Sequence, residues 1–294
     1  MPTSWRALLR RRGLSLLALL CLAIALPIGC AKLEETERKL VFRIESGTAR
    51  WFSGIPSGLE EIQLQSAALA PGESLHAWWW PASRKNAPTL LYLHGSRWNL
   101  TGQLFRIEQL HAMGFAVLAI DYRGFGQSLG QLPSERSVYQ DAQIAWEHLV
   151  RVQPDAGKRY IYGHSLGGAV AVNLAHELAE THDSPQAGGL IVESSFTNLA
   201  EVAQAVTDTA WPLHWLLSQE FDSLAKIGTV GIPVLLAHGR DDHYVPARFS
   251  EALYAAANEP KRLLLIDGAN HNNGLRMAGN QYRQALQALG MMLN

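Results

Sequence analysis

Short apolar runs alternate with longer segments of mixed polarity from about residue 40 onward. Continuous apolar runs of this length are typical of parallel strands that are buried on both faces of a sheet. The runs are TLLYLHG, FAVLAIDYRG, RYIYGHS, GLIVESS, PVLLAHG and RLLLIDGANH. The segments between them predict helices over residues 101–113, 135–152, 166–181, 246–257 and 280–292. This alternation predicts one doubly wound α/β domain with a mostly parallel sheet and right-handed crossovers.

Two segments before the first buried run have a different pattern. The stretches EIQLQS and SLHAWWWPA alternate in polarity or are rich in aromatic residues, and proline and glycine bound them. Such segments are typical of antiparallel strands. We therefore expect two antiparallel strands ahead of the parallel ones.

Residues 196–230 interrupt the alternation of strands and helices. They add helical sequence between two strands, which fits either a small cap over the sheet or connecting helices packed on the core. The apolar residues of this segment are accordingly either a wall for an acyl chain or plain packing, and packing is the interpretation that we favour. These residues are Trp211, Trp215, Leu216 and Leu217.

The first 30 residues have the pattern of a targeting segment. The cationic stretch MPTSWRALLRRR leads into LSLLALLCLAIALPIG, an apolar stretch of 16 residues. This stretch is short for a spanning helix of about 20 residues but suits the apolar region of a signal peptide. We therefore expect residues 1–30 to be a signal peptide or a membrane anchor, and residues 31–294 to form the folded domain on the outer side of a membrane.

Both cysteines, Cys21 and Cys30, lie in this targeting segment, so no disulfide is expected in the folded domain. The sequence LPIGC resembles a bacterial lipobox, in which the cysteine is acylated. Gly29 fits that pattern, whereas Pro27 stands where an aliphatic residue is usual. Lipid attachment at Cys30 and an uncleaved anchor both remain open, and either would hold the protein at the membrane, on the periplasmic side in a bacterium.

Charge argues against a nucleic-acid partner. The whole chain has a formal net charge of −1, but four of its arginines fall in the first 30 residues. The remainder holds 21 basic and 26 acidic residues, which gives about −5. A protein that binds nucleic acid needs a basic surface, so we expect none as a partner.

A serine stands at a junction between predicted elements, in the sequence GHSLG of residues 163–167. The strand RYIY precedes it and the helix LGGAVAVNLAHEL follows it, so Ser165 occupies a sharp strand-to-helix turn. Such a turn strains the backbone of its central residue, and glycine two positions away on each side leaves room for it. The amide of Leu166, at the helix N-terminus, is then free to bind an anion. This arrangement predicts a nucleophile with half of an oxyanion hole.

Residues 75–290 resemble the α/β-hydrolase superfamily, near its Bem46-like and serine-aminopeptidase-like branch. The matching stretches are LLYLHGS, LAIDYRGFGQSLG, YGHSLGG, SSFTNL, FDSLAKI, PVLLAHGRDDHYVP and DGANHNN. The resemblance implies the α/β-hydrolase fold, with a small helical cap inserted at about 196–230. It also implies that the second oxyanion donor is the backbone N–H of the residue after His-Gly, here Ser96. A serine at position 165 excludes the dehalogenase and epoxide hydrolase chemistries of this fold, which need aspartate there.

The resemblance also implies the partners of Ser165, because the family places an acid and then a histidine after later strands. His271 follows the last predicted strand and fits the general base. Asp241 and Asp242 both follow the strand PVLLAHG. In the family pattern the acid lies three residues before a Val-Pro pair, which selects Asp242. Glu193, at the end of another strand, is the alternative acid, although anchoring a neighbouring loop is the simpler role for it.

These residues predict a serine hydrolase that cleaves carboxylic esters or thioesters through an acyl-enzyme, with a small acyl compound as substrate and no cofactor. Aminopeptidase-like cleavage of short peptides is the nearest alternative, and a non-catalytic lipoprotein that binds a ligand is another. A cluster after one strand could suggest a metal, but its spacing supplies no set of three ligands, so we expect no metal. The cluster comprises His238, Asp241, Asp242 and His243.

Overall fold

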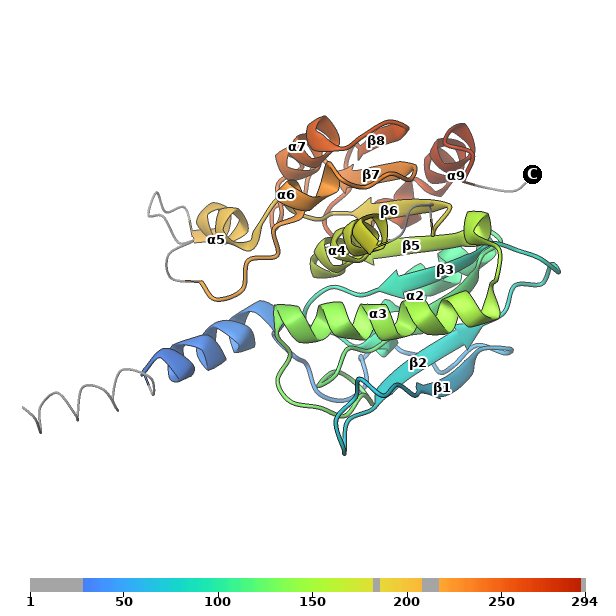
Figure 1. The fold of residues 1–294 in the computed structure, drawn as a ribbon. Helices are drawn as coiled ribbons and strands as arrows, with labels where there is room; N and C mark the ends of the chain where they lie inside the picture. The colour runs from blue at the N-terminus through green and yellow to red at the C-terminus, as the bar shows by residue number, and fades with distance from the viewer. Residues whose placement is uncertain (1–28, 182–185, 208–216, 292–294) are drawn as a thin grey trace, which may run out of the picture.

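The computed structural model describes residues 29–181, 186–207 and 217–291, and eight strands form a single sheet there (Figure 1). Their order across the sheet is β1-β2-β4-β3-β5-β6-β7-β8. The strands are β1 (Glu60–Leu64), β2 (Leu75–Trp80), β3 (Thr89–Leu93), β4 (Ala116–Ile120), β5 (Arg159–His164), β6 (Gly189–Glu193), β7 (Val234–Gly239) and β8 (Lys261–Ile266). The pairs β1·β2 and β2·β4 are antiparallel and all other pairs are parallel. The predicted sheet, including its two antiparallel strands, is therefore confirmed.

Helices cover both faces of the sheet. From β3 onward, the helices of the described residues are α2 (Leu100–Ala112), α3 (Glu135–Val152), α4 (Leu166–Thr181), α5 (Leu199–Thr207), α6 (Ser223–Ile227), α7 (Arg248–Ala256), α8 (Gly274–Met277) and α9 (Gly279–Ala288). Helices α3, α4 and α7 pack into one apolar cluster, and α2, α8 and α9 pack into another. Figure 1 shows α3 and α4 in front of the sheet.

Strand β3 shows how the sheet separates these two clusters. Leu91 and Leu93 belong to the first cluster, whereas Leu90 and Tyr92 belong to the second. Successive side chains of a strand point to opposite faces, so a strand between two helical layers must be apolar at every position. This is the reason that the central strands appear in the sequence as continuous apolar runs.

Two short helices, α5 and α6, lie between β6 and β7, in the segment where the sequence predicts a cap or connecting helices. Leu217, at the start of the described part after α5, packs against the first apolar cluster. Trp211, Trp215 and Leu216 lie outside the described residues.

Residues 29–42 form a helix ahead of β1, which the strand-helix alternation did not predict. Its sequence places acids four residues before bases, in the pairs Glu34–Arg38 and Glu35–Lys39, and such pairs support an exposed helix. Cys30 is exposed at its start. Within the described ranges no helix is both long and apolar enough to cross a bilayer, and residues 1–28 of the expected leader lie outside them.

Candidate active site

Ser165 occupies the turn between β5 and α4, with a backbone φ of +56°. A non-glycine residue in this left-handed region is strained, so the turn persists only where its surroundings hold it. Both flanking glycines are required by contact with other backbone atoms. A Cβ added to Gly163 would lie 2.0 Å from the carbonyl oxygen of Gly167, and one on Gly167 would lie 2.1 Å from that of Leu93. The sequence GHSLG therefore folds into the sharp turn because only glycine fits at its two outer positions.

Two backbone amides beside Ser165 are available to bind an anion. Leu166 opens α4, and Ser96 lies in the loop after β3, next to Gly95. That loop is close to the serine, because a Cβ on Gly95 would lie 3.1 Å from the Cβ of Ser165. Among the described residues, neither amide donates a hydrogen bond to another protein group. Unpaired amides at this position can stabilise a negative charge that develops on a carbonyl oxygen.

The structure brings Ser165, His271 and Asp242 into one hydrogen-bonded row. The Nε2 atom of His271 lies 3.0 Å from the hydroxyl oxygen of Ser165, and its Nδ1 lies 2.7 Å from Oδ2 of Asp242. Since a carboxylate only accepts, Nδ1 carries the proton and Nε2 is free to accept the serine proton. The row is assembled from the ends of β5, β7 and β8, which meet at one edge of the parallel sheet.

Asp242 is buried and accepts hydrogen bonds from four groups. Its Oδ1 accepts from the amides of Tyr244 and Val245, at 2.9 and 2.8 Å, and its Oδ2 accepts from His271 and His238. Burial alone would raise the pKa of this carboxyl, but hydrogen bonds from His238 and His271 outweigh it and hold the pKa well below its ordinary value. Asp242 is therefore ionised, whereas Asp241 is exposed to solvent.

His238 is a site residue for which the sequence analysis proposed no role. It is fully buried, and its Nε2 lies 3.2 Å from Oδ2 of Asp242 and 2.7 Å from the carbonyl oxygen of Val245. Both neighbours are acceptors, so Nε2 carries the proton, and Nδ1 accepts from the hydroxyl of Ser250 at 2.7 Å. The available signal was its position four residues before Asp242, but spacing alone does not distinguish such a partner from a core histidine.

Arg106, another residue that the sequence analysis overlooked, lies behind the catalytic row. It is 1% exposed, and its guanidinium donates to the carbonyl oxygens of His271 and Asn272, at 3.5 and 3.2 Å. Its Nε lies 3.8 Å from a carboxylate oxygen of Glu193. Burial lowers the pKa of Arg106, but the Glu193 carboxylate and the neighbouring tyrosine hydroxyls together outweigh burial, raise the pKa and keep the guanidinium charged. A cation on α2 thus contacts the backbone that carries the histidine.

Glu193 and His164 complete this buried layer. Glu193 is 1% exposed and accepts a hydrogen bond from the hydroxyl of Tyr162. Its carboxylate therefore binds Tyr162, whereas Asp242 is the acid that accepts from Nδ1 of His271. The ring of His164 places Nε2 2.9 Å from the carbonyl oxygen of His271 and 2.9 Å from the Arg106 guanidinium. Burial, followed by the charge of Arg106, lowers the pKa of His164 well below its ordinary value. This histidine is therefore neutral and contacts the backbone of His271.

The buried Arg123 has a structural role, since it forms ion pairs with Asp141 and Glu73, each at 2.6 Å. Within the part of the chain that the structure describes, no three histidine, cysteine or acidic side chains are grouped as metal ligands. His238 and Asp242 instead bond to each other, while Asp241 and His243 are exposed.

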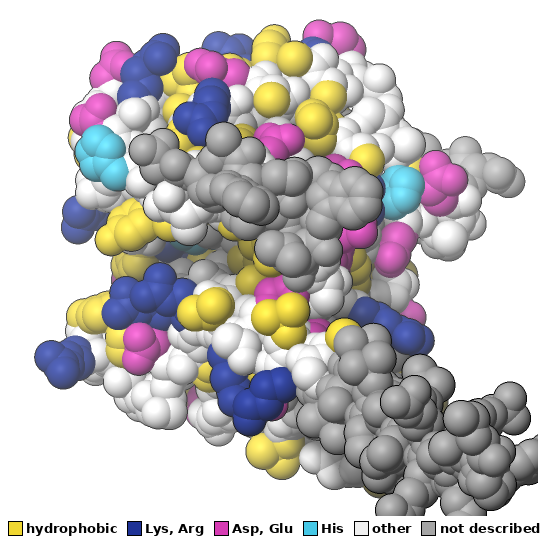
Figure 2. Space-filling view, turned by 90° about the vertical axis from the view of Figure 1, so that its left-hand side faces the viewer, with side chains coloured by type: hydrophobic (Ala, Val, Ile, Leu, Met, Phe, Trp, Pro, Cys, Tyr) yellow, Lys and Arg dark blue, Asp and Glu magenta, His cyan; other side chains and the backbone are white. Residues whose placement is uncertain are grey.

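An exposed aromatic side chain lies near the row. Figure 2 shows the molecule from the left-hand side of Figure 1, with hydrophobic side chains in yellow. The ring of Tyr244 is 68% exposed and lies 5.9 Å from the ring of His271. Trp98, in the loop that carries Ser96, contacts the exposed ring of Trp51 at 5.1 Å. One exposed aromatic ring, that of Tyr244, therefore lies beside the proposed general base.

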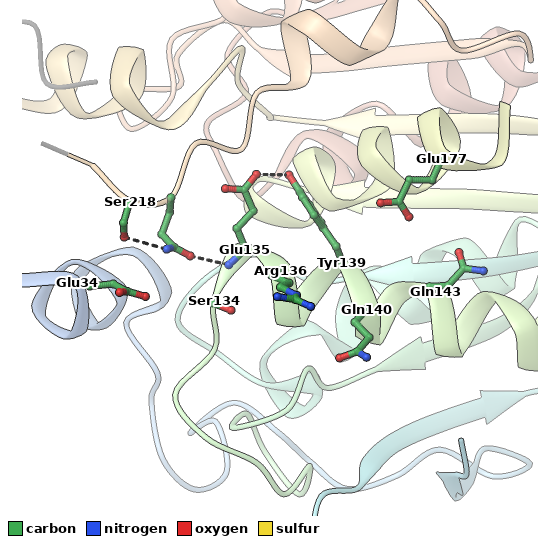
Figure 3. Close-up of a pocket in the computed structure, with 10 residues that line it drawn as sticks. Glu34, Ser134, Glu135, Arg136, Tyr139, Gln140, Gln143, Glu177 and Ser218 are labelled. Carbon is green, nitrogen blue, oxygen red and sulfur yellow. Dashed lines mark hydrogen bonds between the residues drawn. The ribbon is translucent and has the colours of Figure 1, made fainter. Parts of the chain in front are cut away.

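A separate pocket of about 630 Å³ lies on the outer side of α3 (Figure 3). It is open to solvent, and Glu34, Glu135, Tyr139, Glu177 and Ser218 are among the residues that line it. None of the residues of the catalytic row lines it.

Known proteins resemble this chain in sequence. The serine aminopeptidase family S33 matches residues 85–225. The uncharacterized protein Rv2307c of Mycobacterium tuberculosis is 34% identical over 254 residues, which cover 85% of this chain and 86% of that protein. The lysophosphatidylserine lipase ABHD12 of Danio rerio is 34% identical over 203 residues, which cover 63% of this chain and 51% of ABHD12.

Solved structures share the fold. An α/β-hydrolase from Vibrio vulnificus superposes with a TM-score of 0.64 at 22% identity, over 79% of this chain and 82% of that one. The Pyrococcus furiosus esterase PF2001 superposes with a TM-score of 0.62 at 17% identity, over 79% and 90% of the two chains. The predicted α/β-hydrolase fold is therefore confirmed.

Proposed function

Because the chain belongs to the α/β-hydrolase superfamily, we propose that it is a serine hydrolase that cleaves carboxylic esters or thioesters through an acyl-enzyme. The observation that carries this proposal is the row Ser165–His271–Asp242, with donor–acceptor distances of 3.0 and 2.7 Å. A serine hydroxyl becomes an effective nucleophile only when a base can take its proton, and His271 is in position to do so. The nucleophile, base and acid that the proposed hydrolysis needs therefore lie within hydrogen-bonding distance of one another.

In the first half-reaction, the hydroxyl oxygen of Ser165 attacks the carbonyl carbon while Nε2 of His271 takes the hydroxyl proton. The carbonyl oxygen becomes an oxyanion, which the amides of Ser96 and Leu166 can stabilise. When the bond to the leaving group breaks, the imidazolium returns the proton to the departing alcohol or thiol. The product of this step is an ester of Ser165.

In the second half-reaction, a water molecule attacks the acyl carbon and gives its proton to His271, which returns it to Ser165 as the carboxylic acid leaves. Asp242 holds Nδ1 of His271 in the required tautomer and stabilises the imidazolium that forms twice in each cycle. Its lowered pKa supports this role, because the carboxylate is present as an anion at neutral pH.

We propose a lipid-like or otherwise apolar acyl ester as substrate and a membrane as the site of action. The lipase name of the relative ABHD12 and the exposed Tyr244 beside His271 support the substrate class. The apolar leader sequence supports the location. Cys30 is exposed and could carry a lipid, and loss of radioactive palmitate labelling in Cys30→Ser would test that attachment.

Hydrolysis rates test the proposed reaction. Wild type and Ser165→Ala are compared on nitrophenyl esters of increasing acyl length and on aminoacyl nitroanilides. We expect ester hydrolysis by the wild type that Ser165→Ala lacks, and the acyl length giving the highest kcat/KM identifies the substrate class. Cleavage of the anilides but not the esters would instead support the aminopeptidase alternative, which the S33 family match favours. Absence of both activities from folded wild type would leave the third candidate, a lipoprotein that binds its ligand without hydrolysis.

A further inference from the structure

The segment that follows the N-terminal helix runs along the loop that carries Ser96. The amide of Arg97 donates to the carbonyl oxygen of Phe42 at 2.7 Å, and the amide of Glu45 donates to the carbonyl oxygen of Arg97 at 2.7 Å. Both backbone polar groups of Arg97 are thus paired with residues more than 50 positions earlier in the sequence. Since Arg97 directly follows Ser96, these two bonds fix the chain beside the proposed oxyanion donor.

Arg97 depends on such support because its backbone φ is +86°. A residue with a side chain is strained in this region and keeps the conformation only where neighbours impose it. Its exposed side chain contributes a second link, since its Nε lies 3.0 Å from a carboxylate oxygen of Glu45. A relaxed Arg97 would turn the Ser96–Arg97 peptide, which directly follows the residue whose amide is the proposed oxyanion donor.

The contact continues beyond Arg97. The side-chain amide of Asn99 donates to the carbonyl oxygen of Gly47 at 2.7 Å, and the amide of Ala49 donates to the hydroxyl of Thr101 at 3.0 Å. Trp51 then packs edge-on against Trp98, with ring centroids 5.1 Å apart. The loop from residue 97 to the start of α2 is therefore in contact along its length with residues 42–51.

The end of the N-terminal helix, which leads into this segment, is anchored on the return from α5 to α6. Glu37 is 8% exposed, and its carboxylate accepts from the amides of Ser218 and Gln219, each at 2.8 Å, and from the Ser218 hydroxyl at 2.7 Å. Figure 3 shows Ser218 next to the N-terminal helix. Phe42 is fully buried and packs edge-on against Phe125 and Phe221.

We propose that residues 37–51 are a strap that holds the oxyanion loop, residues 95–98, in its active conformation. In this arrangement Glu37 and Phe42 are positioning residues, because they anchor the strap and reach Ser96 only through the backbone of Arg97. The residues that follow the predicted membrane segment thus become part of the catalytic apparatus. The inference rests on the proposed function, which assigns the Ser96 amide to the oxyanion.

The test compares Glu37→Ala with Glu34→Ala in the full chain. Glu34 lies on the same helix but is exposed, and its carboxylate lies 3.8 Å from the guanidinium of Arg38. We expect Glu37→Ala to lower kcat on a nitrophenyl ester by about tenfold with little change in KM, because a misplaced oxyanion donor weakens the transition state more than the bound substrate. Affinity for a trifluoromethyl ketone inhibitor should fall by a similar factor, and Glu34→Ala should behave as wild type.

A rescue separates positioning from general loss of stability. Glycine reaches a φ of +86° without strain, so Arg97→Gly added to Glu37→Ala should recover most of the lost kcat. Wild-type kcat in Glu37→Ala would overturn the proposal, as would an equal loss in Glu34→Ala or no recovery in the double variant. If Glu37→Ala does not fold, Glu37→Gln takes its place. We then expect a smaller loss of kcat and of inhibitor affinity, in the same direction.

Hydrogen exchange tests the strap independently of activity. The Arg97 amide should exchange slowly in the wild type and faster in Glu37→Ala, while amides of the central strand β5 keep their protection. Unchanged exchange at Arg97 would overturn the strap even if the enzyme is active. Conversely, faster exchange at Arg97 in a protein without hydrolase activity would support the strap and count against the proposed function alone.

Discussion

Oδ2 of Asp242 receives a hydrogen bond from Nε2 of the fully buried His238, at 3.2 Å. The same oxygen accepts from His271, so one carboxylate oxygen joins a buried histidine to the proposed general base. A hydrogen bond fixes the direction in which a carboxylate faces, and a carboxylate that is fixed in this way keeps the imidazole in line with the serine. His238 is therefore expected to contribute to the rate without touching the substrate.

His238→Gln should lower kcat on a nitrophenyl ester by about tenfold. A hydrogen bond to a charged group contributes about 1.5–3 kcal/mol, and part of that contribution would be lost from the anion that supports the imidazolium. The exposed His243 provides the matched control, and His243→Gln should retain the wild-type rate. Equal rates for both variants, with folding intact by circular dichroism, would show that His238 only fills the core.

The two neighbouring aspartates should differ sharply in their effect on activity. Asp242→Asn replaces the acceptor of the Nδ1 proton and should reduce kcat by about 10⁴-fold, the loss expected when the histidine takes the wrong tautomer. Asp241→Asn alters an exposed side chain and should change kcat by less than about twofold. Steady-state kinetics on one ester measures both. The reverse ranking would mean that the acid of the row is Asp241.

The lowered pKa of Asp242 predicts a specific dependence of stability on pH. The unfolded chain holds a proton on this carboxyl below about pH 3.9, whereas the folded protein does not until the pH is lower still. Folding is therefore favoured by the carboxylate above that pH, and this contribution is lost as the pH falls through the folded value. Asp242→Asn lacks the titration, so its deficit in unfolding free energy should shrink between about pH 6 and about pH 3. Urea unfolding at several pH values measures this, and a deficit that is constant or grows towards acid would contradict it.

Removing Arg106 should destabilise the protein and leave Glu193 as an unpaired buried anion. Arg106→Gln should cost about 3–5 kcal/mol of unfolding free energy, and adding Glu193→Gln should return part of that loss because the unpaired charge is gone. Arg240 is the control, since its pair with Asp267 is exposed and Arg240→Gln should cost less than about 1 kcal/mol. Additive losses in the double variant would show that the two buried groups are not coupled.

The order of strands and helices could be predicted because apolar runs record burial on both faces of the sheet. Helix α3 begins and ends at the predicted residues, 135 and 152, and Ser134 accepts a hydrogen bond from the amide of Ser137 as its N-cap. Ser165 could be predicted from its strand-to-helix turn, whereas His271 and Asp242 were assigned through the resemblance to the α/β-hydrolase superfamily. The structure brings the three together because the carboxyl ends of parallel strands meet at one edge.

The surroundings of the site could not be predicted in the same way. Arg106 lies within α2, where a single charged residue normally faces solvent, and only the fold shows that it reaches the backbone of His271. The contact of Phe42 with Arg97 joins the end of the N-terminal helix to the oxyanion loop through backbone atoms, which leave no mark in the side-chain pattern. Contacts of this kind depend on the assembled fold, so a single sequence does not indicate them.

The most direct test of the central claim is to locate a fluorophosphonate adduct by mass spectrometry. The probe forms a bond to phosphorus only with a serine that a base has activated. We predict one adduct on the peptide that contains Ser165, formed in the wild type, strongly slowed in His271→Ala and absent from Ser165→Ala. Folded wild-type protein without an adduct, or with the adduct on another serine, would contradict the account.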